Sequence, residues 1–117
     1  MVPSQLDSVF SALSSPVRRS IVARLARGGP VFVGDLQELH DISLPAISRH
    51  LRVLEGAGLV SRTAEGRYRR CELNEKPMAE AMEWIREQKQ FWEESLDRLE
   101  RFLNQEAPAR GDSADDQ

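Results

Sequence analysis

The stretch LPAISRHLRVLEGAGLVSR, at residues 44–62, decides the fold of this chain. Its apolar residues recur at the spacing of one helical face, which predicts an amphipathic helix packed on a core. The residues of this face are Leu44, Ile47, Leu51 and Leu54. Gly56 and Gly58 follow, and glycine is the residue that most often ends a helix. The stretch therefore predicts a helix over residues 44–57 that leads into a strand.

The opposite side of this helix is polar. With Ile47 as the inward direction and about 100° per residue, Arg49 points almost straight outward, with Pro45 and Arg52 beside it and Ser48 on the flank. Short side chains at the start of a helix and arginines further along suit the DNA major groove, because arginine can bind guanine and serine can bind bases or phosphates. We therefore interpret this side as a DNA-reading surface.

The neighbouring segments predict a helix-turn-helix followed by a wing. A short helix is expected at residues 34–39, with Leu36 and Leu39 facing inward. HDIS forms a turn, and Ser43 is a good N-cap for the reading helix, whose N-terminus attracts phosphate. The second helix of such a motif enters the major groove. Residues 59–73 then read as a β-hairpin with its turn at TAEG. Arg67 and Arg69 make this hairpin basic, so we expect it to lie against the DNA backbone or the minor groove.

The segments before the helix-turn-helix predict two helices and a short strand. Residues 4–13 carry one apolar stripe, and residues 16–28 begin after a serine and end at a glycine pair, as helices do. PVFV, at residues 30–33, is long enough only for an edge strand. The expected fold is mainly α with a small β-hairpin, an α+β winged helix-turn-helix in one domain over residues 1–104.

A long final helix is predicted from Pro77 to Asn104. Its apolar residues have the spacing of a coiled-coil seam, interrupted at Lys89, and this pattern is typical of a dimerisation helix. The seam consists of Met78, Met82, Ile85, Trp92, Leu96, Leu99 and Leu103. The polar, acidic tail at residues 105–117 is expected to be disordered.

The composition indicates a globular chain without membrane segments. Apolar residues make up 40% of the sequence and charged residues 30%, and no apolar run approaches the ~20 residues that a membrane span needs. The N-terminus lacks the basic start and the apolar run of a signal peptide, and a single cysteine cannot form an internal disulfide. We therefore expect a cytoplasmic protein.

The net charge of −3 hides an uneven distribution. Residues 43–70 contain six arginines and two glutamates, a local charge of +4. Residues 76–117 contain six basic and eleven acidic residues, a local charge of −5. Because nucleic acid responds to local charge, the basic middle of the chain favours double-stranded DNA as a partner in spite of the acidic total.

The sequence offers little for catalysis or metal binding. His40 and His50 form no recognisable pattern with Cys71 or a carboxylate, and no glycine-rich phosphate loop follows a strand. We predict no enzyme activity, no cofactor and no metal. His50 lies toward the inward side of the reading helix and is expected to be half-buried and hydrogen-bonded. Cys71 is either a small packed residue or a redox-sensing thiol activated by Arg69 or Arg70.

Together these segments resemble the ArsR-type winged-helix transcriptional regulators over residues 6–103. FSALSSPVRRSIVARLARG resembles the opening helices of that family, and VGDLQELHDISLPAISRHLRVLEGAGLVSRTAEGRYRRCEL resembles its reading head and wing. FWEESLDRLERFL resembles the last helix of a branch without metal ligands. Metal-sensing branches carry a cysteine motif in the helix at residues 34–39, or His and carboxylate ligands in the last helix. This chain has VFVGDL in the first place and no histidine in the second.

The resemblance implies a homodimer whose first and last helices form the interface, with one reading helix per half-site of a palindromic operator. Many members have glutamine where Leu44 stands, so base reading here is expected to concentrate on Ser48, Arg49 and Arg52. The predicted DNA-binding residues are Ser43, Leu44, Pro45, Ser48, Arg49, Arg52, Arg67 and Arg69. The predicted dimer interface consists of Leu6, Val9, Phe10, Met82, Ile85, Trp92, Leu96, Leu99 and Leu103.

The sequence therefore predicts a homodimeric, sequence-specific DNA-binding transcriptional regulator that represses a promoter by occluding it. One alternative is a winged-helix module that binds other proteins, because a fold does not fix a function. The other alternative is a repressor that senses oxidants through Cys71. The sequence indicates no particular small-molecule effector.

Overall fold

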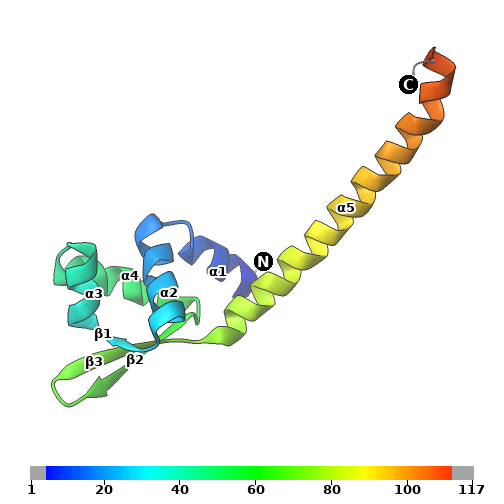
Figure 1. The fold of residues 1–117 in the computed structure, drawn as a ribbon. Coiled ribbons are helices and arrows are strands. Elements are labelled where there is room, and N and C mark those ends of the chain that lie inside the picture. Colours follow the sequence, from blue (N-terminus) through cyan, green and yellow to red (C-terminus); the bar gives the residue numbers. More distant parts are fainter. Residues whose placement is uncertain (1–4, 112–117) are drawn as a thin grey trace. The chain divides into compact units, whose positions relative to one another are not determined.

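The computed structural model describes residues 5–111, with side chains up to Gln105. It divides into two compact units, the first up to Ala81 and the second from Met82 onward. The elements are α1 (Gln5–Ala12), α2 (Pro16–Gly28), β1 (Val31–Phe32), α3 (Val33–His40), α4 (Leu44–Gly56), β2 (Val60–Glu65), β3 (Tyr68–Leu73) and α5 (Glu75–Gly111) (Figure 1). This order confirms the predicted mainly α fold with a helix-turn-helix and a hairpin wing.

The hairpin wing, formed by β2 and β3, belongs to a small three-stranded antiparallel sheet. Its strand order is β1-β3-β2, so β1 is an edge strand, as predicted, and pairs Val31 with Cys71 on the central strand. The hairpin turn is shorter than TAEG suggests, because β2 continues to Glu65, which pairs with Tyr68. Only Gly66 and Arg67 form the loop, and Gly66 has a φ of 63° at the position where type II′ hairpins place glycine.

Serine caps start the two helices that matter most for the motif. The Ser15 hydroxyl accepts a hydrogen bond from the Arg18 amide at 3.3 Å, and the Ser43 hydroxyl accepts one from the Ala46 amide at 3.2 Å. Each cap satisfies an amide that the helix itself leaves unpaired. Gly58 follows α4 with a φ of 79° and turns the chain from the reading helix into β2.

The core of the first unit is formed by one face of each helix and by the sheet. Ile47, Leu51 and Leu54 of α4 are all 0% exposed, so the predicted inward face is confirmed at these positions. The other fully buried large side chains are Val9, Ile21, Leu36, Leu59 and Cys71. Ala81, near the start of α5, also belongs to this core.

Two expectations for the helices are wrong. Leu39 was expected to face inward, but it is 61% exposed, because the packed side of α3 runs through Val33, Leu36 and His40. The final helix was expected to end at Asn104, but α5 continues to Gly111. Extending an existing helix adds one hydrogen bond per residue without a new nucleation step. Residues 112–117 of the predicted tail lie outside the described part.

Replacing Leu51 with alanine tests the role of the buried face of α4. Leu51→Ala should lower the free energy of unfolding by about 2–5 kcal/mol, because it leaves a cavity in a closely packed core. Leu39→Ala is the matched control, and it should change this free energy by no more than about 0.5 kcal/mol because Leu39 is exposed. Equal effects of both variants in chemical denaturation would contradict the placement of α4.

Candidate DNA-binding surface

The outward side of α4 is exposed along the whole helix. Pro45, Arg49 and Arg52 are exposed, and Leu44 is 49% exposed although its spacing matches the buried face. Leu44 is the first residue of the helix, and the packed part of the face begins one turn later, at Ile47. The start of the reading helix is therefore an apolar, exposed end followed by two arginines.

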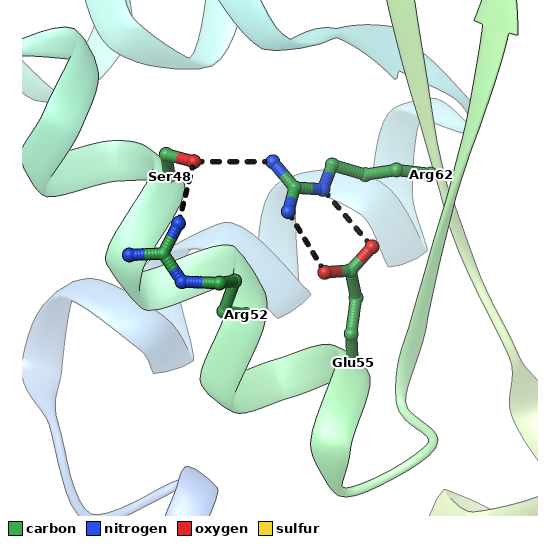
Figure 2. A network of polar contacts seen from close by, with 4 residues as sticks. All are labelled: Ser48, Arg52, Glu55 and Arg62. Atoms are coloured by element: carbon green, nitrogen blue, oxygen red, sulfur yellow. Dashed lines mark hydrogen bonds and ion pairs between the residues drawn. The ribbon is translucent and has the colours of Figure 1, made fainter.

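Ser48 lies at the centre of a polar network between α4 and β2 (Figure 2). The guanidinium of Arg62 donates from Nε and Nη2 to the Glu55 carboxylate, both at 2.9 Å, and from Nη1 to the Ser48 hydroxyl at 3.3 Å. Arg52 donates to the same hydroxyl at 3.4 Å. The hydrogen bond to Glu55 is the main reason that the pKa of Arg62 is raised, so this side chain stays charged.

This network ties the reading helix to the wing. Glu55 stands near the end of α4 and Arg62 near the start of β2, and their side chains are 29% and 18% exposed. A bidentate, partly buried pair of this kind holds its two elements in a fixed geometry better than an exposed pair does. The Glu55–Arg62 pair therefore holds the outward residues of α4 and the arginines of the hairpin in a fixed position relative to one another.

The wing carries an exposed basic end. Arg67 lies in the two-residue loop, and Arg69 and Arg70 follow on β3, all exposed. Tyr68 is also exposed, and its ring packs on Phe32 of β1 with centroids 5.5 Å apart. The aromatic contact ties the loop end of β3 to the edge strand.

A pocket of about 370 Å³ shows which predicted residues come together. It is lined by Leu44 and Ser48 of α4, Arg62 of β2, Arg69 of β3 and Val33 of α3. Two predicted residues of the reading helix and one of the wing thus meet at one place on the surface. Arg62 and Val33 are the members of this group that were not predicted to belong to the site, and Arg62 is the charged one.

His50 supports the reading helix from its inner flank, as predicted. Its Nδ1 lies 3.3 Å from Nη1 of Arg18, whose Nε also donates to the carbonyl of Ala12 at 2.6 Å. Burial, followed by the charge of Arg18, lowers the pKa of His50. The imidazole is therefore neutral at pH 7, and its Nδ1 accepts the hydrogen bond from Arg18.

Comparisons with known proteins agree with this geometry. Residues 13–63 match a helix-turn-helix domain family. The transcriptional repressor SdpR of Bacillus subtilis is 35% identical over 80 residues, which cover 68% of this chain and 88% of SdpR. An ArsR family transcriptional regulator with a known crystal structure is 35% identical in sequence. The match covers 80% of this chain and 95% of that regulator, and the two structures superpose with a TM-score of 0.71. The chain belongs to the ArsR family of winged helix-turn-helix transcriptional regulators.

A second solved structure supports the same family. An ArsR-like transcriptional regulator from Rhodococcus sp. RHA1 is 26% identical and covers 84% of this chain and 92% of its own, with a TM-score of 0.70. The resemblance expected from the sequence is thus confirmed. Within the ArsR frame, α3 and α4 are the helix-turn-helix, and β2 and β3 are the wing.

The predicted dimer residues fall into two groups. Val9 is 0% exposed in the core of the first unit, so its side chain offers no surface to a second chain, and its assignment to the interface is wrong. Leu6 packs partly against the same core, whereas Phe10 is 38% exposed. The predicted residues of α5 are all exposed large apolar side chains. They are Met82, Ile85, Trp92, Leu96, Leu99 and Leu103.

Cys71 has the properties of a packed residue and not those of a redox sensor. Its side chain is 0% exposed on the central strand. Burial raises the pKa of the thiol to about 11, and the charge of Arg62 offsets this only in part. Reactive cysteines are exposed and have lowered pKa values. The oxidant-sensing alternative is therefore not supported.

Neither a metal cluster nor a membrane helix occurs in the described part of the chain. Among residues 5–111, no group of three His, Cys, Asp or Glu side chains is arranged to hold a metal ion. Within the same range, no helix is both long enough and apolar enough to cross a membrane.

The rate of thiol alkylation should report the buried state of Cys71. The thiolate is the reactive form, so the rate in the folded protein should rise about tenfold per pH unit up to a pKa of about 11. In denaturant, the alkylation rate of the same thiol should stop rising once the pH passes its ordinary pKa of about 8.5. Mass spectrometry measures the extent of alkylation over time. A rate that reaches its plateau below pH 9 in the folded protein would contradict the burial of Cys71.

Proposed function

We propose that this chain is a homodimeric transcriptional repressor that binds a palindromic operator. Membership of the ArsR family makes it a DNA-binding transcriptional regulator. The proposal adds that α4 enters the major groove and that the wing lies beside it, with repression arising because the bound dimer occludes a promoter. It places the protein in the cytoplasm and requires no catalytic step and no cofactor.

The exposed face of α4, together with the basic wing, is the observation that carries the proposal. Arg49 makes no hydrogen bond or ion pair within the described residues, so its guanidinium is available for a bidentate contact to guanine. Ser43, Arg67 and Arg69 are also exposed and suit contacts to phosphates, which position a protein on DNA without reading sequence. Leu44 and Pro45 offer only apolar contact, for example to a thymine methyl group.

The second copy is argued from the apolar seam of α5. Trp92 is 63% exposed, Leu96 59% and Leu99 52%, and contiguous exposed apolar surface of this kind marks an interaction site. The heptad spacing of these residues fits a partner helix of the same kind. Met78 does not belong to this seam, because it packs against the core of the first unit. A dimer of this kind would present two reading helices to half-sites about 34 Å apart.

Genome-wide mapping of bound DNA would supply the operator and the neighbouring genes together. The motif recovered should be a palindrome whose half-sites are about one helical turn apart. Affinity for it should fall steeply with salt, because the arginines displace counterions from phosphate. Absence of any enriched DNA at low salt would favour the protein-interaction alternative.

Arg49→Ala tests the reading face. With operator DNA in a titration, this variant should lose about 1–3 kcal/mol of binding free energy if the side chain makes a bidentate base contact. The matched control is Arg27→Ala, which removes the same charge from α2, outside the proposed surface. Unchanged affinity in Arg49→Ala would remove this residue from the site.

Trp92→Ala tests the seam of α5. The variant should weaken the dimer, because Trp92 is the most exposed of the seam residues and would be buried by a second copy. Glu94→Ala is the control, since residue 94 lies on the opposite side of the same helix. Sedimentation should show monomer appearing at a higher protein concentration for Trp92→Ala than for Glu94→Ala. A Trp92→Ala profile that stays fully dimeric on dilution would refute the placement.

A further inference from the structure

We propose that the Glu55–Arg62 ion pair restricts the Ser48 hydroxyl to donating its hydrogen bond to DNA, so that Ser48 selects base pairs that place an acceptor atom, and not an amino group, at the position it reaches. The inference rests on the proposed function, because it concerns how the reading helix discriminates among sequences. It assigns Glu55 and Arg62 as positioning residues that act through Ser48 without reading a base themselves.

The first step is that Arg62 is held in one orientation. The Glu55 carboxylate accepts hydrogen bonds from Nε and Nη2 of the Arg62 guanidinium, at 2.9 Å each, and these two bonds fix the plane of the guanidinium. The remaining nitrogen, Nη1, then points at Ser48, with its donor 3.3 Å from the hydroxyl oxygen (Figure 2). Because the Arg62 side chain is only 18% exposed, solvent competes little for this arrangement.

The second step is the hydrogen-bonding capacity of Ser48. A hydroxyl group has two acceptor lone pairs and one hydrogen to donate. Arg62 and Arg52 both donate to its oxygen, at 3.3 Å and 3.4 Å, so both lone pairs are used. Within the described residues, the hydroxyl hydrogen of Ser48 has no acceptor. The group therefore presents a donor at the partly exposed flank of the reading helix.

The third step is what a donor can recognise. In the major groove, guanine presents N7 and O6 as acceptors, adenine N7 and thymine O4, whereas the amino groups of cytosine and adenine are donors. A serine with free lone pairs can bind either class, so serine alone carries little discrimination. A serine whose lone pairs are occupied pairs only with the acceptor atoms. The ion pair, together with the hydrogen bond from Arg52, thus turns a permissive side chain into a selective one.

The experiment compares the base preferences of full-length variants. Double-stranded DNA randomised over the operator would be bound by the wild type, by Ser48→Ala and by Glu55→Gln, and the bound fragments sequenced. Ser48→Ala should lose roughly three- to tenfold of the preference at one base pair per half-site, the worth of a single neutral hydrogen bond. Glu55→Gln should relax the preference at that same base pair. Because DNA phosphates repel a carboxylate, Glu55 would not contact the base itself, and its effect would act through Arg62 and Ser48.

Glu65→Gln is the matched control for Glu55→Gln. Glu65 is on the same hairpin as Arg62, but its side chain is 57% exposed. Its carboxylate makes only a long ion pair, at 4.0 Å, with Arg70. Each variant removes one negative charge near the proposed surface, so both should raise affinity for all DNA. Only Glu55→Gln should also change the base preference. If Glu55→Gln unfolds, Arg62→Lys replaces it, since a single ammonium cannot hold Glu55 at two points and reach Ser48 as well.

Synthetic half-sites identify the polarity of the contact. At the base pair found with Ser48→Ala, one acceptor atom or one exocyclic amino group is removed at a time. Loss of one acceptor should weaken the wild type and leave Ser48→Ala unaffected. The inference is overturned if loss of an amino donor has that effect, or if Ser48→Ala weakens all sequences equally, as a phosphate contact would. A wild type that shows no sequence preference at all would instead overturn the proposed function.

Discussion

The burial of one face of α4 is the constraint on which the rest of the molecule depends. Ile47, Leu51 and Leu54 are completely removed from solvent, and this fixes both the position and the rotation of the helix on its neighbours. A rotation of the helix about its axis would expose these side chains, at a cost of about 1.5–3 kcal/mol for each. The outward side is therefore presented in one orientation, and the polar contacts of Ser48 and Arg62 refine it.

Much of this could be predicted because it depends on local patterns. The caps at Ser15 and Ser43, the helices of the motif and the hairpin each follow from residues a few positions apart. The family resemblance adds the way in which these elements are combined. Leu39 and Leu44 were harder to place, because spacing gives the angle around a helix but not how much of its length is covered by neighbours.

The Glu55–Arg62 pair shows a different limit. The two residues lie on elements whose contact depends on tertiary structure, so their distance cannot be read from helical spacing alone. A partial signal was present, since Arg62 is two residues after the buried Val60 and opposite the buried Cys71, which places it on the helix-facing side of β2. Val9 was misassigned for a related reason: an apolar stripe cannot distinguish the core of a protomer from an interface with another chain.

The pairing of β1 with β3 has a consequence for how the molecule forms. Val31 and Cys71 are partners in the sheet, and the whole helix-turn-helix lies in the chain between them. Closing so long a loop costs conformational entropy that is recovered only once the enclosed helices are packed. The central strand therefore connects the wing to the reading head, and we expect the two to fold together, because the pairing across this loop forms only when both are in place.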